Sequence, residues 1–271
     1  MSVSLVYNPT LPDARKWAEK AQESFPNADL GTEPTDAERL VIFGGDGTVR
    51  SAINAKPDAE FAVVPCGSGN DFVKSVGIPS SPEEAIQIAK GKARPIDLVE
   101  YEGEKKGLFL NIAEIGFGAR VVRHATKLKP LTGQKASYSL AILTALVGHR
   151  LSPISLEVDG KKVGDFHMAN TLVANGQYFA GNMHPMPHAR VDDGILEIAV
   201  LNDFTRWKIL TQAHILKTGI PANHQRIQIF RGKEIYITSS EPVGVEADGD
   251  LLGNLPIRFT VRPGALQFVC P

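Results

Sequence analysis

Residues 41–50 read Val-Ile-Phe-Gly-Gly-Asp-Gly-Thr-Val-Arg and carry the strongest structural signal in the chain. The apolar run 40–43 predicts a buried strand, and a segment able to form a helix, 49–55, follows the glycine turn directly. Adjacent glycines tolerate positive φ and let a ligand approach the main chain without meeting a Cβ atom. Amides at such a junction point outward, and the helix dipole favours negative charge there. The pattern predicts a phosphate-binding turn, with a ligand-free tight turn as the alternative.

Asp46 lies inside this turn and indicates what kind of phosphate it binds. A carboxylate repels a phosphate unless a cation lies between them, so Asp46 favours a nucleotide with Mg²⁺. No lysine follows the last glycine and the glycine spacing is not G-x-G-x-x-G, which excludes the P-loop and the dinucleotide fingerprint.

A second junction of the same kind follows about twenty residues later. Residues 61–64 predict a short strand, and 65–72 read Pro-Cys-Gly-Ser-Gly-Asn-Asp-Phe. Ser68 has a hydroxyl that can donate to a phosphate, Asn70 has an amide that can fix the loop, and Asp71 adds a second carboxylate. Together the two turns are much stronger evidence of a phosphate site than either one alone.

The first third of the chain predicts an α/β domain with a Rossmann-like parallel sheet and flanking helices. Strands near 3–7, 40–43 and 61–64 alternate with helical patterns, one over 13–25 and one opened by a capping box at 81–84. Ligands of such sheets bind beyond the carboxyl ends of the strands, where both glycine turns lie.

After residue 95 the pattern changes to short strands in hairpin rhythm, which predicts a mostly antiparallel, β-rich second domain. We place the domains at 1–101, with 263–271 returning to the first, and at 102–262, with the active site in the cleft between them. Helices are expected at 135–148 and 204–217. The expected strands are 153–158, 166–174, 195–201, 226–230, 234–238, 243–247 and 257–261, with turns at Asp159-Gly160 and Asn175-Gly176.

Composition narrows the function class. The net charge of −1 argues against a dedicated nucleic-acid binder. The two cysteines have no C-x-x-C spacing, which fits a reduced, cytoplasmic setting. No leader and no membrane span are expected, so an enzyme acting on a lipid would have to visit the membrane surface.

Residues 115–156 contain no Asp or Glu but several basic side chains. A solvated helix face is one interpretation, and a basic wall for ATP phosphates or anionic lipid headgroups is the other. The apolar side chains within this stretch could line an acyl-chain groove, although core packing is the favoured expectation. The side chains concerned are Tyr138, Leu140, Ala141, Leu143, Thr144 and Val147; the basic ones are Arg120, Arg123, Lys127, Lys129, Lys135 and Arg150.

The two glycine motifs, followed by Val-Gly-Ile-Pro at 76–79, resemble the diacylglycerol kinase catalytic domain. The closer likeness is to soluble bacterial lipid kinases related to diacylglycerol and sphingosine kinases. Later motifs follow the family in order over nearly the whole chain. They are Ile96-Asp97-Leu98, 109–112, 116–118, 133–138, Asn175-Gly176, 193–196 and 247–250.

The resemblance implies an ATP- and Mg²⁺-dependent kinase that transfers the γ-phosphate to a hydroxyl of a diacylglycerol-like lipid at the membrane surface. It implies catalytic roles for Asp46, Asp71, Asp97 and Asp250, with Asp250 as proton acceptor. It implies a structural Mg²⁺ held by the Asp193 carboxylate and the main-chain carbonyls of Arg190 and Ile195. The implied nucleotide-binding residues are Thr32, Gly44, Gly45, Asp46, Gly47, Thr48, Val49, Arg50, Ser51, Gly67, Ser68 and Asn70.

The chain departs from the family pattern in ways that keep alternatives open. Asp250 stands where the family usually has Glu, so its reach is about 1 Å shorter, and a misplacement of about 1 Å can cost ~100-fold in rate. Asp248-Gly249 can equally be a plain hairpin turn, and so can Asp193-Gly194. Only 36–39 remain where relatives have a helix, and Arg120 with Val122 disfavours a sphingoid substrate. The rival functions are a NAD kinase and a catalytically weak regulatory homologue; a homodimer stays open.

Overall fold

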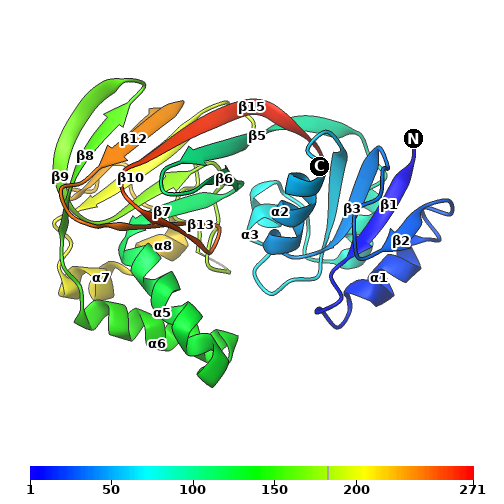
Figure 1. The fold of residues 1–271 in the computed structure, drawn as a ribbon, viewed down its shortest axis with the longest axis horizontal. Helices are drawn as coiled ribbons and strands as arrows, with labels where there is room; N and C mark the ends of the chain where they lie inside the picture. The colour runs from blue at the N-terminus through cyan, green and yellow to red at the C-terminus, as the bar shows by residue number, and fades with distance from the viewer. Residues whose placement is uncertain (182) are drawn as a thin grey trace.

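The structure is a computed structural model describing residues 1–181 and 183–271, with all of their side chains except those of Thr132, Gln134 and Lys135. Its N-terminal part is a parallel sheet in the order β2-β1-β3-β4, which confirms the predicted α/β class (Figure 1). The elements are β1 (Val3–Tyr7), α1 (Ala14–Ala21), β2 (Asp29–Gly31), β3 (Arg39–Gly44), α2 (Asp46–Ala55), β4 (Glu60–Pro65), α3 (Asp71–Ser75) and α4 (Pro82–Ile88).

The hydrophobic patterns and the helix cap expected from the sequence account for these elements. Every residue of β3 is buried, as its continuous apolar run predicts for a central parallel strand. Helix α1 buries Ala14, Ala18 and Ala21 at helical spacing. Ser81 caps α4 by accepting a hydrogen bond from the Glu84 amide, with proline at the first turn. No helix forms between β2 and β3, in agreement with the shortened segment 36–39.

The C-terminal part is built almost entirely from antiparallel pairs, as predicted. Strand β9 changes neighbours along its length, pairing with β8 near its start and with β7 and β10 near its end. The elements are β5 (Ala93–Glu102), β6 (Lys106–Phe109), β7 (Ile112–Gly116), α5 (Phe117–Thr132), α6 (Gln134–Val147), β8 (Ser152–Val158), β9 (Lys161–Ala174), β10 (Leu196–Asn202), α7 (Arg206–Gln212), α8 (Ile215–Thr218), β11 (Ile227–Gly232), β12 (Glu234–Thr238), β13 (Gly244–Ala247), β14 (Asp250–Asn254) and β15 (Ile257–Val269).

Strands β5 and β15 join the two parts. They pair with each other along most of their length, and β15 bends between Arg262 and Leu266. Beyond that bend, Gln267 and Phe268 pair in parallel with β4 of the first sheet. The long pair therefore runs from one part to the other, and Figure 1 shows it spanning both.

Three expectations about the second part are wrong. Helix α5 was not predicted, because Gly116, Gly118 and Pro130 disguise its helical pattern. The helix expected over 204–217 is divided into α7 and α8. Strands β9 and β10 do pair, but the Asn175-Gly176 segment opens a long connection between them rather than a tight turn.

The apolar residues of α6 also differ from expectation. Ala141 is buried against α5, but the other five side chains of this prediction are exposed, so the favoured expectation of core packing is wrong for them. They are Tyr138, Leu140, Leu143, Thr144 and Val147. Within the described residues, no helix combines the length and the hydropathy that crossing a bilayer requires.

Candidate functional site

The two glycine turns pack directly against each other at the carboxyl ends of β3 and β4. The Cys66 amide donates to the Gly44 carbonyl at 2.9 Å, and a Cβ atom on Gly67 would lie 2.6 Å from the Gly45 Cα. Neither turn has a glycine with φ between +20° and +160°, so the expectation of positive φ is wrong. Glycine is needed here because the backbones approach so closely.

Asp46 holds the two turns in register. Its carboxylate oxygens accept hydrogen bonds from the amides of Asp71 and Phe72, each at 3.0 Å, at the start of α3. Burial raises the pKa of Asp46 and the nearby Asp71 carboxylate raises it further, while the two amides lower it. The structure thus brings together the acids of both predicted turns.

Asn70 and Asp71 fix the second turn. Asn70 takes φ 52° and folds its amide back onto Gly67, accepting from the Gly67 amide at 3.1 Å and donating to its carbonyl at 2.8 Å. Asp71 accepts from the Gly181 amide at 2.8 Å, and Lys74 donates to the Gly181 carbonyl at 2.6 Å. These bonds tie α3 to the long β9–β10 connection of the second part.

Some of the predicted nucleotide-binding residues are exposed to solvent, whereas others are buried or hydrogen bonded within the protein. Gly47 and Ser68 are exposed, and no acceptor for the Gly47 amide is found within the described chain. Thr32 is also exposed, directly after β2. By contrast Val49 is buried in the core, Thr48 accepts a hydrogen bond from Asn8, and Ser51 donates to the Gly47 carbonyl; these groups shape the turn rather than face a ligand.

Asp248 is a half-buried acid that the sequence interpretation did not include among the site residues. It has φ 47° in the β13–β14 turn and accepts hydrogen bonds from the amides of Leu110, Asn111 and Ile112 at 2.8–3.2 Å. Burial raises the pKa of Asp248 to about 6, and the nearby Asp46 carboxylate contributes to the rise. The turn predicted at Asp248-Gly249 is therefore present, and it also carries a site acid.

Asp250 and Arg50 meet across the boundary between the two parts, two hundred positions apart in sequence, in an ion pair. The Asp250 side chain is 62% exposed. Both residues line a cavity of about 280 Å³ together with Tyr101, whose pKa is raised by burial and by Asp250. Helix α2 supplies Arg50, while β5 and β14 supply the other two, so this cavity lies between the parts.

Asp97 occupies a different place from the one predicted. Its two carboxylate oxygens accept from the amides of Gly194 and Gly264, at 2.7 and 2.9 Å, and its side chain is buried. None of its described contacts is with Asp46, Asp71 or Asp250. It anchors the 193–194 turn to the bend in β15, which is a structural role.

The predicted Mg²⁺ sites fit the structure unequally. Asp193 accepts from the Ile195 amide at 3.0 Å and pairs with Arg231 at 3.1 Å, while Arg190 pairs with Asp192. A guanidinium therefore already balances Asp193, and the residues as arranged do not fit a cation there. Of the two acids expected at the catalytic Mg²⁺, Asp71 accepts from the Gly181 amide and lies beside Lys74. Asp46 is instead close enough to Asp248 for its carboxylate to raise the pKa of Asp248, and a cation between these two half-buried acids would relieve that repulsion.

Two further acids that were not predicted, Glu114 and Glu246, lie near Asp248 and form a buried pair. Glu114 in β7 and Glu246 in β13 face each other across the ladder. Glu114 accepts from Asn170 at 2.7 Å, and Glu246 accepts from the Gly249 amide at 2.9 Å. Burial raises the pKa of both side chains, and that of Glu246 rises well above its ordinary value because Glu114 lies beside it. Glu246 thus keeps a proton and supports the turn that carries Asp248.

We expect Glu246→Gln to stabilise the protein at neutral pH. The raised pKa means that folded Glu246 holds a proton that the unfolded chain releases above about pH 4.5, so wild-type stability declines as the pH rises through this window. Glutamine can still donate to Glu114 and accept from Gly249 without ionising. Urea unfolding near pH 4 and pH 7 should show a gain of about 1 kcal/mol or more at the higher pH only. The exposed control Glu23→Gln should show no such difference, and a destabilised Glu246→Gln at pH 7 would contradict the protonated pair.

Taken together, the fold and the site define a two-domain protein with an α/β N-terminal domain, an antiparallel β-rich C-terminal domain and acids at the boundary between them. The chain matches the diacylglycerol kinase catalytic domain over residues 3–101 and the YegS C-terminal NAD kinase beta sandwich-like domain over 111–270. It is 33% identical to a probable lipid kinase YegS-like protein of Pseudomonas aeruginosa, covering 86% of this chain and 76% of that protein. It is 30% identical to a protein of the same description from Shewanella frigidimarina, with the same coverage of both. The chain therefore belongs to the YegS-like lipid kinase family.

Solved structures support the same fold. A putative diacylglycerol kinase from Bacillus anthracis superposes with a TM-score of 0.79 at 22% identity, covering 100% of this chain and 97% of that one. An NAD kinase from Archaeoglobus fulgidus, in complex with ATP, superposes with a TM-score of 0.57 at 16% identity, covering 99% and 93%. At these identities the likeness concerns the fold alone.

Proposed function

We propose that the protein transfers the γ-phosphate of ATP to a hydroxyl of a diacylglycerol-like lipid. The observation that carries this proposal is the convergence of both glycine turns and the Asp46–Asp248 pair with a cavity lined by Asp250. Phosphoryl transfer depends mainly on positioning and charge neutralisation, which this arrangement can supply.

Each part of the site has a distinct task in this proposal. The Gly47 amide and the Ser68 hydroxyl donate to phosphate oxygens, and Arg50 adds a guanidinium suited to bidentate phosphate contact. Asp46 and Asp248 would hold Mg²⁺, which neutralises phosphate charge when bound. Mg²⁺ is commonly bound through one or two carboxylates with phosphate oxygens and water completing its shell, so this pair suffices.

Asp250 is the proposed proton acceptor for the lipid hydroxyl. Its exposed carboxylate at the cavity can reach a substrate entering from solvent. Asp250 is paired with Arg50, so a phosphate that draws the guanidinium away would free Asp250 for the acceptor. The shorter side chain of aspartate is compensated if the β13–β14 turn, fixed by Asp248, holds the backbone close to the acceptor.

The direct test is ADP release from Mg·ATP on addition of diacylglycerol in mixed micelles. We expect lipid-dependent release with a phosphorylated lipid as product. Nucleotide binding without ADP release from any hydroxyl-bearing lipid would support the regulatory alternative instead. Efficient phosphorylation of NAD⁺ would support the NAD kinase alternative, and a radiolabelled-ATP screen of a total lipid extract would identify another acceptor.

Substitution at Asp250 tests its role separately. Asp250→Asn keeps the size of the side chain but removes the base, so kcat should fall by roughly 10²–10⁴-fold while the KM for ATP changes little. Asp250→Glu retains a base with longer reach and should keep activity within about tenfold of wild type. If Asp250→Asn turned over at the wild-type rate, another group would have to accept the proton.

A further inference from the structure

Helix α6 exposes an unusually wide apolar face. Its sequence is almost free of charge, yet its buried residues form a narrow strip of mostly small side chains packed on α5, including Ala141 and Ala145. On the other side, Leu143 is 60% and Val147 is 76% exposed. A helix that is apolar on most of its circumference is normally buried on all sides. The exposed apolar side of α6 is therefore suited to bind a further apolar surface.

Helix α7 continues this surface. None of its residues is buried, Trp207 is 77% exposed, and Leu210 is exposed beside it. The His149 ring, just after α6, hydrogen bonds to the Phe204 carbonyl, just before α7, at 2.7 Å. Figure 1 shows α6 and α7 together on the same side of the second domain. We call the exposed side chains Leu140, Leu143, Val147, Trp207 and Leu210 the α6–α7 face.

Positive charge gathers where α6 ends and α7 begins, and Arg120 donates to the Gly148 carbonyl there. Burial lowers the pKa of Arg120, and the like charges of Arg150 and Arg123 lower it further, which shows that cations crowd together here. The pKa of His149 is lowered by burial, with added repulsion from Arg120 and Arg206. The stretch 115–156 contributes no acid to balance them.

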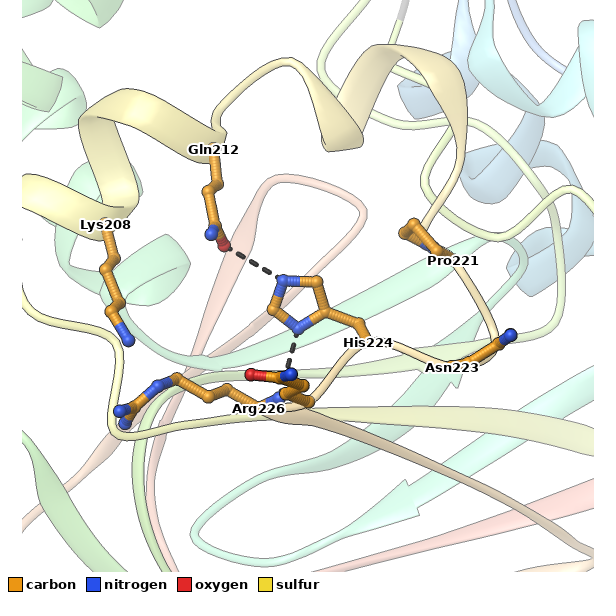
Figure 2. A pocket seen from close by; sticks show the side chains of 7 residues that line it. Lys208, Gln212, Pro221, Asn223, His224 and Arg226 are labelled. Carbon is orange, nitrogen blue, oxygen red and sulfur yellow. Dashed lines mark hydrogen bonds between the residues drawn. The ribbon is translucent and has the colours of Figure 1, made fainter.

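A basic pocket opens next to α7 (Figure 2). It has a volume of about 460 Å³, and Lys208 from α7 and Arg226 from the segment before β11 project toward the same side. His224 also lines the pocket; its ring hydrogen bonds to the Gln212 side chain at 3.1 Å and accepts from the Arg226 amide at 3.2 Å. Asp203 is the acid in contact with Arg226, at 4.0 Å, and Lys208 has no ion pair among the described side chains.

We propose that the α6–α7 face docks on an anionic phospholipid bilayer, with a lipid phosphate group seated between Lys208 and Arg226. Apolar side chains flanked by basic ones are the pattern that binds such interfaces, through burial in the acyl boundary and attraction to anionic lipids. The charge pattern selects the bilayer over a second copy of the chain, because two copies would bring like charges together.

This docking rests on the proposed lipid kinase function and specifies how the enzyme reaches its substrate. Helix α6 also carries Tyr138, whose pKa is raised by burial and by the nearby Glu246, Glu114 and Asp250 carboxylates. Helix α6 therefore carries the docking side chains Leu140, Leu143 and Val147 together with a tyrosine within electrostatic range of Asp250.

The test is flotation of the full chain with vesicles, without ATP. Wild type should bind phosphatidylglycerol vesicles at least about tenfold more tightly than phosphatidylcholine vesicles, and high salt should weaken this binding. Leu143→Ser and Trp207→Ser should each weaken it about tenfold or more. The double change Lys208→Gln with Arg226→Gln should reduce the preference for anionic vesicles. Val163→Ser and Lys90→Gln, exposed positions elsewhere, are the matched controls.

The outcomes separate docking from catalysis. Leu143→Ser and Trp207→Ser should retain wild-type turnover on a short-chain, water-soluble diacylglycerol, which shows that they fold and that the loss is at the membrane. Vesicle binding by a chain that phosphorylates no lipid would leave the docking surface intact and reject the proposed function. Absence of wild-type binding, equal binding to neutral vesicles, or a dimer that Leu143→Ser dissociates would overturn the docking proposal.

Discussion

Asp46→Asn should lower lipid phosphorylation by at least ~100-fold, because it removes the charge that Asp46 contributes to metal and phosphate binding. It should also cost stability. The two Asp46 oxygens accept from the Asp71 and Phe72 amides, and asparagine would turn an NH₂ group toward one of them. Leaving one buried donor without an acceptor costs about 1–3 kcal/mol. Steady-state ADP release and urea unfolding measure the two effects independently.

A control distinguishes loss of charge from loss of folding in this experiment. Ser68→Ala removes an exposed hydroxyl for which no internal bond is found in the described structure, so it should weaken ATP binding modestly without changing stability. If Asp46→Asn kept wild-type turnover while losing stability, Asp46 would be a structural cap of α3 and not part of the metal site.

Asp248→Ala should destabilise the protein by about 2–4 kcal/mol and abolish activity. Three backbone amides, of Leu110, Asn111 and Ile112, would lose their acceptor, and each unpaired buried donor costs about 1–3 kcal/mol. Relief from burying a charge offsets part of this, because the pKa of Asp248 is raised to about 6. The loss should be visible in chemical unfolding monitored by tryptophan fluorescence.

The pH dependence of the stability of Asp248→Ala shows whether the protonated or the ionised form of Asp248 stabilises the fold. A raised pKa means that wild-type stability includes a contribution present below about pH 3.8 and lost as the pH rises to about 6. Asp248→Ala lacks this contribution, so its deficit relative to wild type should be largest in acid and smaller above pH 6. A deficit that grew as the pH rose would show that the ionised carboxylate is the stabilising form.

Much of the fold and part of the site could be predicted from local patterns. The strands at 3–7, 40–43 and 61–64 and the cap at Ser81 follow from hydrophobic runs and short-range hydrogen bonding, and the structure confirms them. Asn70 was expected to fix its loop and does so. Helix α5 escaped prediction because glycine and proline within it lower its helical signal, and packing on α6 outweighs that preference.

Other features depend on residues that are distant in the sequence. The sequence around Asp248 does not indicate that its carboxylate accepts hydrogen bonds from the three amides of 110–112. The sequence around Asp97 likewise does not indicate that it accepts from the amides of Gly194 and Gly264. The exposure of α6 is of the same kind, because an apolar helix looks identical in sequence whether it lies in a core or on a surface.

The order of residues alone determined an α/β domain with two glycine turns, because a strand, a glycine turn and a helix occupy a few consecutive positions. Folding decided which acids face one another, since Arg50 reaches Asp250 and Asp46 approaches Asp248 only when the two domains pack together. Hydrogen bonds within a turn are encoded locally, whereas the burial and pairing of a carboxylate depend on every segment that surrounds it.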